Sequence, residues 1–163
     1  MKKKLAALLT AVLCLSLFAG CGSKKEDLEY IKDNGEMVMG ITLFEPMNYN
    51  DENGELTGFE TEFAQAVCKK LGVKAKFQVI DWNRKEMELK SKAIDCIWNG
   101  LTVTEERKEN MAFSKSYVSN YQVAVIRKAD AEKYVDIASM SGARMIAESG
   151  SAGQTAIEND EVL

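Results

Sequence analysis

The strongest constraint on the fold is an amphipathic helix that lies between two segments with the patterns of β-strands. Residues 37–41 form a short apolar run, and residues 73–80 alternate apolar and polar side chains. Residues 60–71 between them have helical periodicity, and Gly72 provides a stop. The residues predicted on the inner face of this helix are Phe59, Phe63, Ala66, Val67, Lys70 and Leu71. This order predicts an α/β fold with a mostly parallel sheet.

The rest of the chain repeats this alternation in shorter segments. Further helices are predicted over residues 26–33, 84–91 and 150–159 and directly after Thr104, with short helical pieces in 130–141. Further strands are predicted over 93–98, 121–127 and 143–147, and Asn53-Gly54 predicts a hairpin turn. Thr104 is the expected N-cap of the helix that contains Arg107. In the charged helix over 84–91, Glu86 and Glu88 are expected on a solvated face; the alternative is that Glu86 faces the cleft and favours a cationic side chain.

The N-terminus has the features of an export signal. Lysines at positions 2–4 precede an apolar segment over 5–17 that is too short for a comfortable membrane span. The following Phe18-Ala19-Gly20-Cys21 resembles a bacterial lipobox, in which Cys21 is lipidated and becomes the mature N-terminus. Residues 1–20 are therefore predicted to be a lipoprotein signal peptide, and residues 21–35 the lipidated cysteine, a polar tether and a short helix. The alternative is an ordinary signal peptide with an incidental Cys21.

Composition excludes several classes of function. The chain contains no histidine, which removes the usual metal ligand and makes a Ser-His or Cys-His nucleophile impossible. We expect neither a metal nor a cofactor. The formal net charge is −4, and without the three lysines of residues 1–20 it becomes −7. With no basic patch interleaved with aromatic residues, nucleic acid is not an expected partner.

The four cysteines fall into two groups. Cys14 and Cys21 belong to the N-terminal signal, so only Cys68 and Cys96 belong to the folded body. Both lie in apolar sequence surroundings, where a free thiol behaves as a small hydrophobic group. We expect two unpaired buried thiols, and a disulfide between them is the alternative.

Three loops that follow predicted strands carry the candidate binding residues. In open α/β sheets, ligands bind outside the carboxyl ends of the strands. A carboxylate is bound well by a guanidinium together with hydroxyl and backbone N–H donors, which Arg107, Thr102 and the amide after Gly100 can supply. The helix start at residues 151–153 adds oriented N–H groups. Phe44 can stack on the body of a ligand, and Trp82 can line a pocket.

Three motifs in order resemble the polar amino-acid-binding proteins of ABC importers, solute-binding family 3. These are Gly54-Glu55-Leu56-Thr57-Gly58-Phe59-Glu60, Lys69-Lys70-Leu71-Gly72-Val73 and Thr102-Val103-Thr104-Glu105-Glu106-Arg107. The resemblance implies a periplasmic-binding-protein-like, two-lobed fold that closes on its ligand. Residues 36–122 would form a nearly complete first lobe, and residues 123–163 a hinge strand and a partial second lobe. Because the second lobe of the family is longer, we expect a C-terminally truncated receptor.

The resemblance also implies which residues contact the ligand. The residues implied are Phe44, Met47, Trp82, Trp98, Asn99, Gly100, Thr102, Arg107, Ser151 and Ala152. Phe44 would stack on the ligand and Arg107 would bind its carboxylate. Ala152 stands where the family usually has threonine, so one hydroxyl contact is lost. Trp82 and Trp98 are equally well interpreted as core residues. Without the family resemblance, Arg107 would be interpreted as a solvated helix residue.

The resulting hypothesis is an extracytoplasmic receptor, anchored to the cell membrane by lipid, that captures an amino acid for an ABC importer. Its expected partners are a free amino acid, the transporter permease and the membrane, and we expect a monomer without catalytic residues. Which amino acid is bound stays open. One alternative is an enzyme of the cyclohexadienyl dehydratase type, for which Glu45 and Glu148 are the carboxylates at strand ends. Another is a sensor module.

The lipobox leads to a direct prediction. Changing Cys21→Ser removes the sulfur atom to which the lipid would be attached, so the protein should move from the membrane fraction to the soluble fraction. Fractionation and labelling with a radioactive fatty acid measure this. The neighbouring Ser23→Ala variant should stay lipidated, and persistent lipid labelling of the Cys21→Ser variant would contradict the anchor.

Overall fold

A computed structural model of the chain describes residues 26–163. The predicted signal peptide, Cys21 and most of the tether lie outside the described residues. Among the residues that are described, no helix has the length and apolar character needed to cross a membrane.

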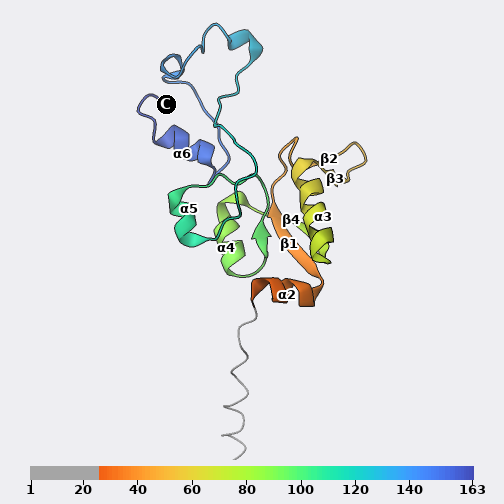
Figure 1. Ribbon diagram of the computed structural model, residues 1–163. Coiled ribbons are helices and arrows are strands. Elements are labelled where there is room, and N and C mark those ends of the chain that lie inside the picture. The colour runs from red at the N-terminus through yellow and green to blue at the C-terminus, as the bar shows by residue number, and fades with distance from the viewer. Residues whose placement is uncertain (1–25) are drawn as a thin grey trace, which may run out of the picture.

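Three parallel strands form the centre of the fold (Figure 1). Their order is β4-β1-β5, with bounds β1 Glu36–Ile41, β4 Lys74–Val79 and β5 Cys96–Ile97. Strand β1 pairs along its whole length with β4, and helix α3, Phe59–Leu71, makes the crossover between them. The predicted α/β class and the parallel sheet are therefore confirmed.

Strand β5 is shorter than the predicted segment 93–98 because a side chain replaces part of its ladder. The backbone N–H of Val38 donates to the carboxylate of Asp95 at 2.7 Å, and the N–H of Asp95 donates to the carbonyl of Val38 at 2.8 Å. Only Cys96 and Ile97 then continue as regular strand residues, and they pair with the centre of β1.

Short helices and a small hairpin surround this sheet. The remaining helices are α2 Asp27–Asn34, α4 Lys85–Lys90, α5 Glu105–Asn110 and α6 Ala152–Glu158, with 3-10 turns η1 Trp82–Arg84, η2 Lys128–Asp130 and η3 Ala138–Met140. Strands β2 Tyr49–Asn50 and β3 Leu56–Thr57 pair antiparallel around the predicted turn at Asn53-Gly54. These predicted helices and the hairpin are confirmed, apart from shifts of a few residues at their ends.

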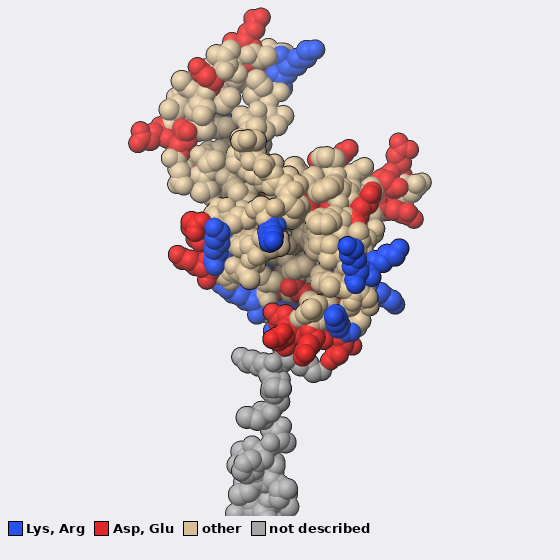
Figure 2. Space-filling model, in the orientation of Figure 1, with Lys and Arg blue, Asp and Glu red and all other residues tan. Residues whose placement is uncertain are grey.

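Charged side chains of both signs are mixed on the face shown in Figure 2. Lysines and arginines lie beside aspartates and glutamates around the lower part of the molecule, and acidic side chains gather at the upper right, near strands β2 and β3.

Helix α3 buries a different face from the one predicted. Glu60, Thr61, Ala64 and Cys68 are buried, whereas Phe59 is 50% exposed. The prediction followed the aromatic residues, but the small residues face the sheet because they permit close approach of helix and strands. Phe63 packs to one side of the sheet, with its ring centroid 5.5 Å from that of Trp98 and 5.3 Å from that of Tyr117.

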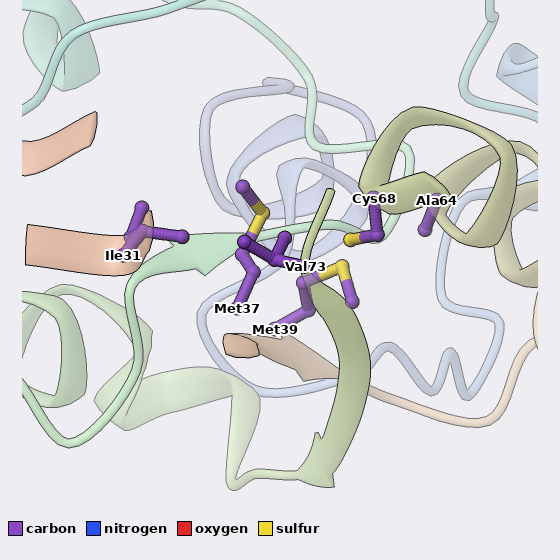
Figure 3. Close-up of a cluster of buried hydrophobic side chains, with 6 residues drawn as sticks. All are labelled: Ile31, Met37, Met39, Ala64, Cys68 and Val73. Carbon is purple, nitrogen blue, oxygen red and sulfur yellow. The ribbon is translucent and has the colours of Figure 1, made fainter. Parts of the chain in front are cut away.

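The main core lies between α2, α3 and the sheet (Figure 3). Its buried members are Ile31, Met37, Met39, Ala64, Cys68 and Val73. Each large side chain of this kind stabilises the fold by about 1.5–3 kcal/mol through burial. On the other side of β1, Gly40 has no side chain, and a Cβ there would lie 2.6 Å from Cδ1 of Ile94. The centre of the sheet is thus packed tightly.

Both body cysteines are free thiols, as expected from their apolar surroundings. Cys68 is buried, and Cys96 packs against the same core. Burial, followed by the charge of Asp95, raises the pKa of the Cys96 thiol to about 12. Neither thiol is a nucleophile at neutral pH.

The strands predicted over 121–127 and 143–147 are absent from the described structure, where both segments are irregular (Figure 1). Val123, Val125 and Ile146 are 76%, 92% and 98% exposed. These two predictions are wrong for the described structure, because a strand forms only where a second strand accepts its backbone hydrogen bonds. No such neighbour is found for either segment within residues 26–163.

The start of α3 provides a stability test. Gly58 has φ of 114°, and a Cβ there would collide with the Met47 carbonyl oxygen and approach that of Pro46 to 2.8 Å. Gly58→Ala should therefore lower the free energy of unfolding by at least about 2 kcal/mol, measured by urea denaturation.

A second glycine serves as the control. Gly72 also has a positive φ, of 76°, but a Cβ there would meet no atom within 4 Å. Gly72→Ala should cost only the conformational penalty of about 1 kcal/mol. Equal losses of unfolding free energy in Gly58→Ala and Gly72→Ala would contradict a destabilising collision at Gly58.

Candidate functional site

The loops after β1 and β5 are joined by the side chain of Asn99. Its Nδ2 donates to Oγ1 of Thr42 at 2.7 Å, and its Oδ1 accepts from the backbone N–H of Thr42 at 3.1 Å. The same Oδ1 accepts from Nδ2 of Asn48 at 2.8 Å. These contacts hold the Asn99 side chain in place and use one of the two N–H donors of its Nδ2, so its role as a ligand contact stays a prediction.

Two buried residues that were not predicted continue this network. Asn48 is fully buried, and its Oδ1 accepts from the hydroxyl of Thr61 at 2.9 Å. The Thr61 hydroxyl also lies 3.1 Å from the carbonyl of Thr57. Asn48 therefore links the loop after β1 to helix α3. An asparagine close to the end of an apolar strand was the available sequence signal.

Arg107 is positioned by its own helix cap. Thr104 accepts from the backbone N–H of Arg107 at 3.2 Å, which confirms the predicted N-cap of α5. The guanidinium donates from Nη1 to the carbonyl of Thr102 at 2.8 Å and from Nη2 to the carbonyl of Gly150 at 3.3 Å. Arg107 is half-buried, and it joins the loop after β5 to the turn before α6.

Lys85 donates to the Gly150 carbonyl as well. It is only 5% exposed, a burial that the charged sequence of residues 84–91 did not indicate. Its Nζ donates to the carbonyls of Trp82 at 3.1 Å and Gly150 at 2.9 Å, and lies 5.0 Å from the centroid of the Trp82 ring. Trp82 is itself buried, 7% exposed, beneath this lysine.

Burial and charge affect the protonation of two groups here. Burial, and then the positive charge of Arg107, lower the pKa of Lys85, while Glu86 and Glu148 act in the opposite direction. Burial raises the pKa of Glu148, and the charge of Lys85 partly opposes this rise. The carboxylates near Lys85 therefore offset its positive charge only in part.

The predicted site residues separate into two groups. Those that line one cavity of about 1180 Å³ are Phe44, Met47, Trp98, Asn99, Gly100 and Thr102. Phe44 is 60% exposed, and the indole N–H of Trp98 is buried without a hydrogen-bond partner among residues 26–163. A cavity of this size exceeds the usual range for small ligands, about 300–1,000 Å³.

The other predicted residues gather around Gly150 instead. These are Trp82, Arg107, Ser151 and Ala152. The hydroxyl of Ser151 caps α6 by accepting from the N–H of Gln154 at 3.1 Å, and Ala152 begins that helix. Thr102 connects the two groups, because it lines the cavity and its carbonyl holds Arg107.

A buried carboxylate that was not predicted lies beside the cavity. Glu60 is fully buried at the start of α3, and the hydroxyl of Tyr117 donates to its carboxylate, with both oxygens 2.9 Å away. A Cβ on Gly100 would lie 3.6 Å from Oε1 of Glu60. This contact fixes the segment around Tyr117 against the first part of the chain.

No group of three or more carboxylate or thiol side chains suited to a metal ion occurs in the described part of the chain. The arrangement of donors instead suits an anionic group. Two cationic side chains, backbone carbonyls that hold them in place, and an exposed aromatic ring lie at the ends of parallel strands.

The Tyr117–Glu60 contact leads to a prediction for stability. Tyr117→Phe removes the phenol donor from a fully buried carboxylate, which should lower the free energy of unfolding by about 1–3 kcal/mol at neutral pH. Urea denaturation measures the loss. The control is Tyr121→Phe, because Tyr121 is 86% exposed and its change should have little effect.

The same variant tests a pH dependence. Burial, then the hydrogen bond and charge of Glu60, raise the pKa of Tyr117 above its ordinary value of 10.0. The folded state therefore keeps a proton that the unfolded state releases, so this contribution is present below pH 10 and falls as the pH rises above it. The free energy of unfolding should fall less steeply with pH above 10 in Tyr117→Phe than in the unchanged protein. Equal slopes in the two proteins would contradict the raised pKa of Tyr117.

Comparisons with known proteins place the chain in a family. Residues 37–160 match the family model described as bacterial extracellular solute-binding proteins, family 3. The L-cystine-binding protein TcyJ of Escherichia coli K12 is 33% identical over 127 residues, which cover 75% of this chain and 48% of that protein. The chain thus spans about half the length of the curated relatives it matches.

Two solved structures support the same placement. A substrate-binding protein of an ABC uptake transporter from Streptococcus pneumoniae, with bound histidine, has a TM-score of 0.77 at 35% identity and covers 83% of this chain and 55% of its own. The ancestral amino-acid-binding protein AncCDT-1, a precursor of cyclohexadienyl dehydratase, has a TM-score of 0.77 at 28% identity. This match covers 82% of this chain and 60% of that protein. The expected periplasmic-binding-protein-like fold is confirmed, and the chain belongs to the bacterial extracellular solute-binding proteins of family 3.

Proposed function

We propose that this protein is an amino-acid receptor that works outside the cytoplasm and delivers its ligand to the permease of an ABC importer. The observation that carries the proposal is the position of Arg107. The Thr102 carbonyl holds its guanidinium at the carboxyl end of the sheet. The guanidinium also donates to the carbonyl of Gly150. A free amino acid always offers the carboxylate that such a guanidinium binds.

The remaining groups provide the other parts of a ligand site. Arg107 uses two of its N–H donors in the contacts above, and further donors stay available for a ligand carboxylate. Phe44 has an exposed ring that can stack on the ligand, and Thr102 and the backbone after Gly100 lie at the same end of the sheet. Met47 and Trp98 would line the side-chain end of the pocket.

Binding would be coupled to closure of two lobes. We assign residues 36–122 to the first lobe and residues 123–163 to the hinge strand and part of the second. Arg107 and Lys85 on the first lobe both contact Gly150 on the second, so the two assigned parts meet at the site. A ligand shifts this equilibrium only by its difference in affinity for the open and closed forms.

The proposed setting is the outer face of the cell membrane. The lipobox at Cys21 supports a lipid anchor, and the matched family is described as extracellular. We further propose that the receptor acts as a monomer, with the permease as its protein partner. Its close relatives include proteins named for the binding of cystine and of arginine.

An enzyme on the same fold is the alternative, because one structural neighbour is a precursor of cyclohexadienyl dehydratase. The neighbour itself is named as an amino-acid-binding protein. Glu148 lies in a loop of the site, and the pKa of its carboxyl group is raised, which would suit a general acid. We favour a receptor without turnover. Conversion of prephenate by the purified protein would reverse that choice, whereas thermal stabilisation by an amino acid without turnover supports it.

Arg107→Ala tests the proposal. Loss of the guanidinium should weaken the affinity for the amino acid that binds best by at least about tenfold, or about 1.4 kcal/mol. Isothermal titration calorimetry with the standard amino acids and L-cystine measures this. Arg127→Ala removes an exposed arginine and should leave the affinity unchanged. An unchanged affinity in Arg107→Ala would remove Arg107 from the site.

A further inference from the structure

Lys85 is a buried cation whose partners in the structure are neutral. It begins the short helix α4 and is 5% exposed, and its ammonium donates to the carbonyl oxygens of Trp82 and Gly150. Within the described residues, no carboxylate oxygen lies within ion-pair distance of its Nζ. An ammonium removed from water without a carboxylate partner is costly to the fold.

The surrounding charges do not remove this cost. Arg107, a second cation, comes from α5 and lowers the pKa of Lys85 further, while Glu86 on the same helix and Glu148 before Gly150 act only at longer range. Neither glutamate forms an ion pair with it; Glu86 lies 3.9 Å from Lys90 instead. A buried cation with a like charge beside it marks a place where a negative group would be favourable.

The position of that negative group is given by Gly150. Its carbonyl oxygen lies 2.9 Å from Nζ of Lys85 and 3.3 Å from Nη2 of Arg107, so an ammonium and a guanidinium meet at one oxygen atom. A neutral carbonyl makes weaker hydrogen bonds to such groups than a carboxylate does. Gly150 also has a φ of 72°, and its N–H is bonded to the side chain of Gln154 at 2.7 Å.

We propose that Lys85 is a second cationic residue that binds the ligand's carboxylate, with one carboxylate oxygen at the position of the Gly150 carbonyl oxygen. Arg107 and Lys85 would then hold the carboxylate from two sides. Thr102 and Trp82 would hold the two cations through their backbone carbonyls. This role rests on the proposed amino-acid receptor and adds a residue that the family resemblance did not indicate.

The test compares an amino acid with its own α-amide, which lacks the carboxylate charge. The standard L-amino acids and L-cystine are titrated into the purified protein, and the tightest of them is tested again as its α-amide. Lys85→Met should weaken binding of the free acid about tenfold and change binding of the α-amide by less than about twofold. Lys90→Met removes an exposed lysine from the same helix and should change neither affinity.

Two further variants separate charge from support of the fold. Lys85→Gln keeps an N–H donor for the Trp82 and Gly150 carbonyls but has no charge. Like Lys85→Met, it should lose the preference for the free amino acid over its α-amide. Lys85→Arg keeps the charge and should retain most of that preference. Parallel losses for acid and amide, or unchanged affinities, in Lys85→Met and Lys85→Gln would overturn the role of Lys85 and leave the receptor intact. Failure of every amino acid to bind the unchanged protein would instead overturn the receptor.

Discussion

The arrangement of the site depends on one side-chain amide, that of Asn99. It receives and donates hydrogen bonds at the end of β1 and also accepts from Asn48, so two neighbouring strand ends are held in fixed register. A partly buried amide with its partners in place is held rigidly, and losing one partner leaves a costly unsatisfied group. The loop from Trp98 to Thr102 therefore has a defined path, and the carbonyl that holds Arg107 is part of that path.

This path brings together groups that lie far apart in the sequence. Arg107 follows the loop by a few residues, Lys85 begins a helix on the neighbouring side of the sheet, and Gly150 comes from the part of the chain assigned to the second lobe. One carbonyl oxygen is the point where the three meet. In the proposed receptor, a ligand carboxylate oxygen would take the place of this carbonyl oxygen between the two cations.

Local patterns were sufficient to predict β1, α3, β4 and the cap at Thr104, because these elements are determined by residues close in sequence. They were insufficient where partners are distant. Asn99 was predicted to face the ligand, since its type and position suit either role, and its bonds to Thr42 and Asn48 emerge only in the folded state. The burial of Lys85 was not predicted for a similar reason: it is caused by Trp82 and by Gly150, 65 residues away. The ligand contacts themselves stay predictions.

The free thiols in the core have a consequence for the environment in which such a protein works. Thiol–disulfide exchange requires a thiolate, and a pKa near 12 leaves Cys96 almost entirely protonated at any physiological pH. Cys68 is enclosed by methionine, alanine and valine side chains, which also keep oxidants away (Figure 3). In the folded domain, these two thiols are thus poor partners for thiol–disulfide exchange, and they need no reductase to stay reduced.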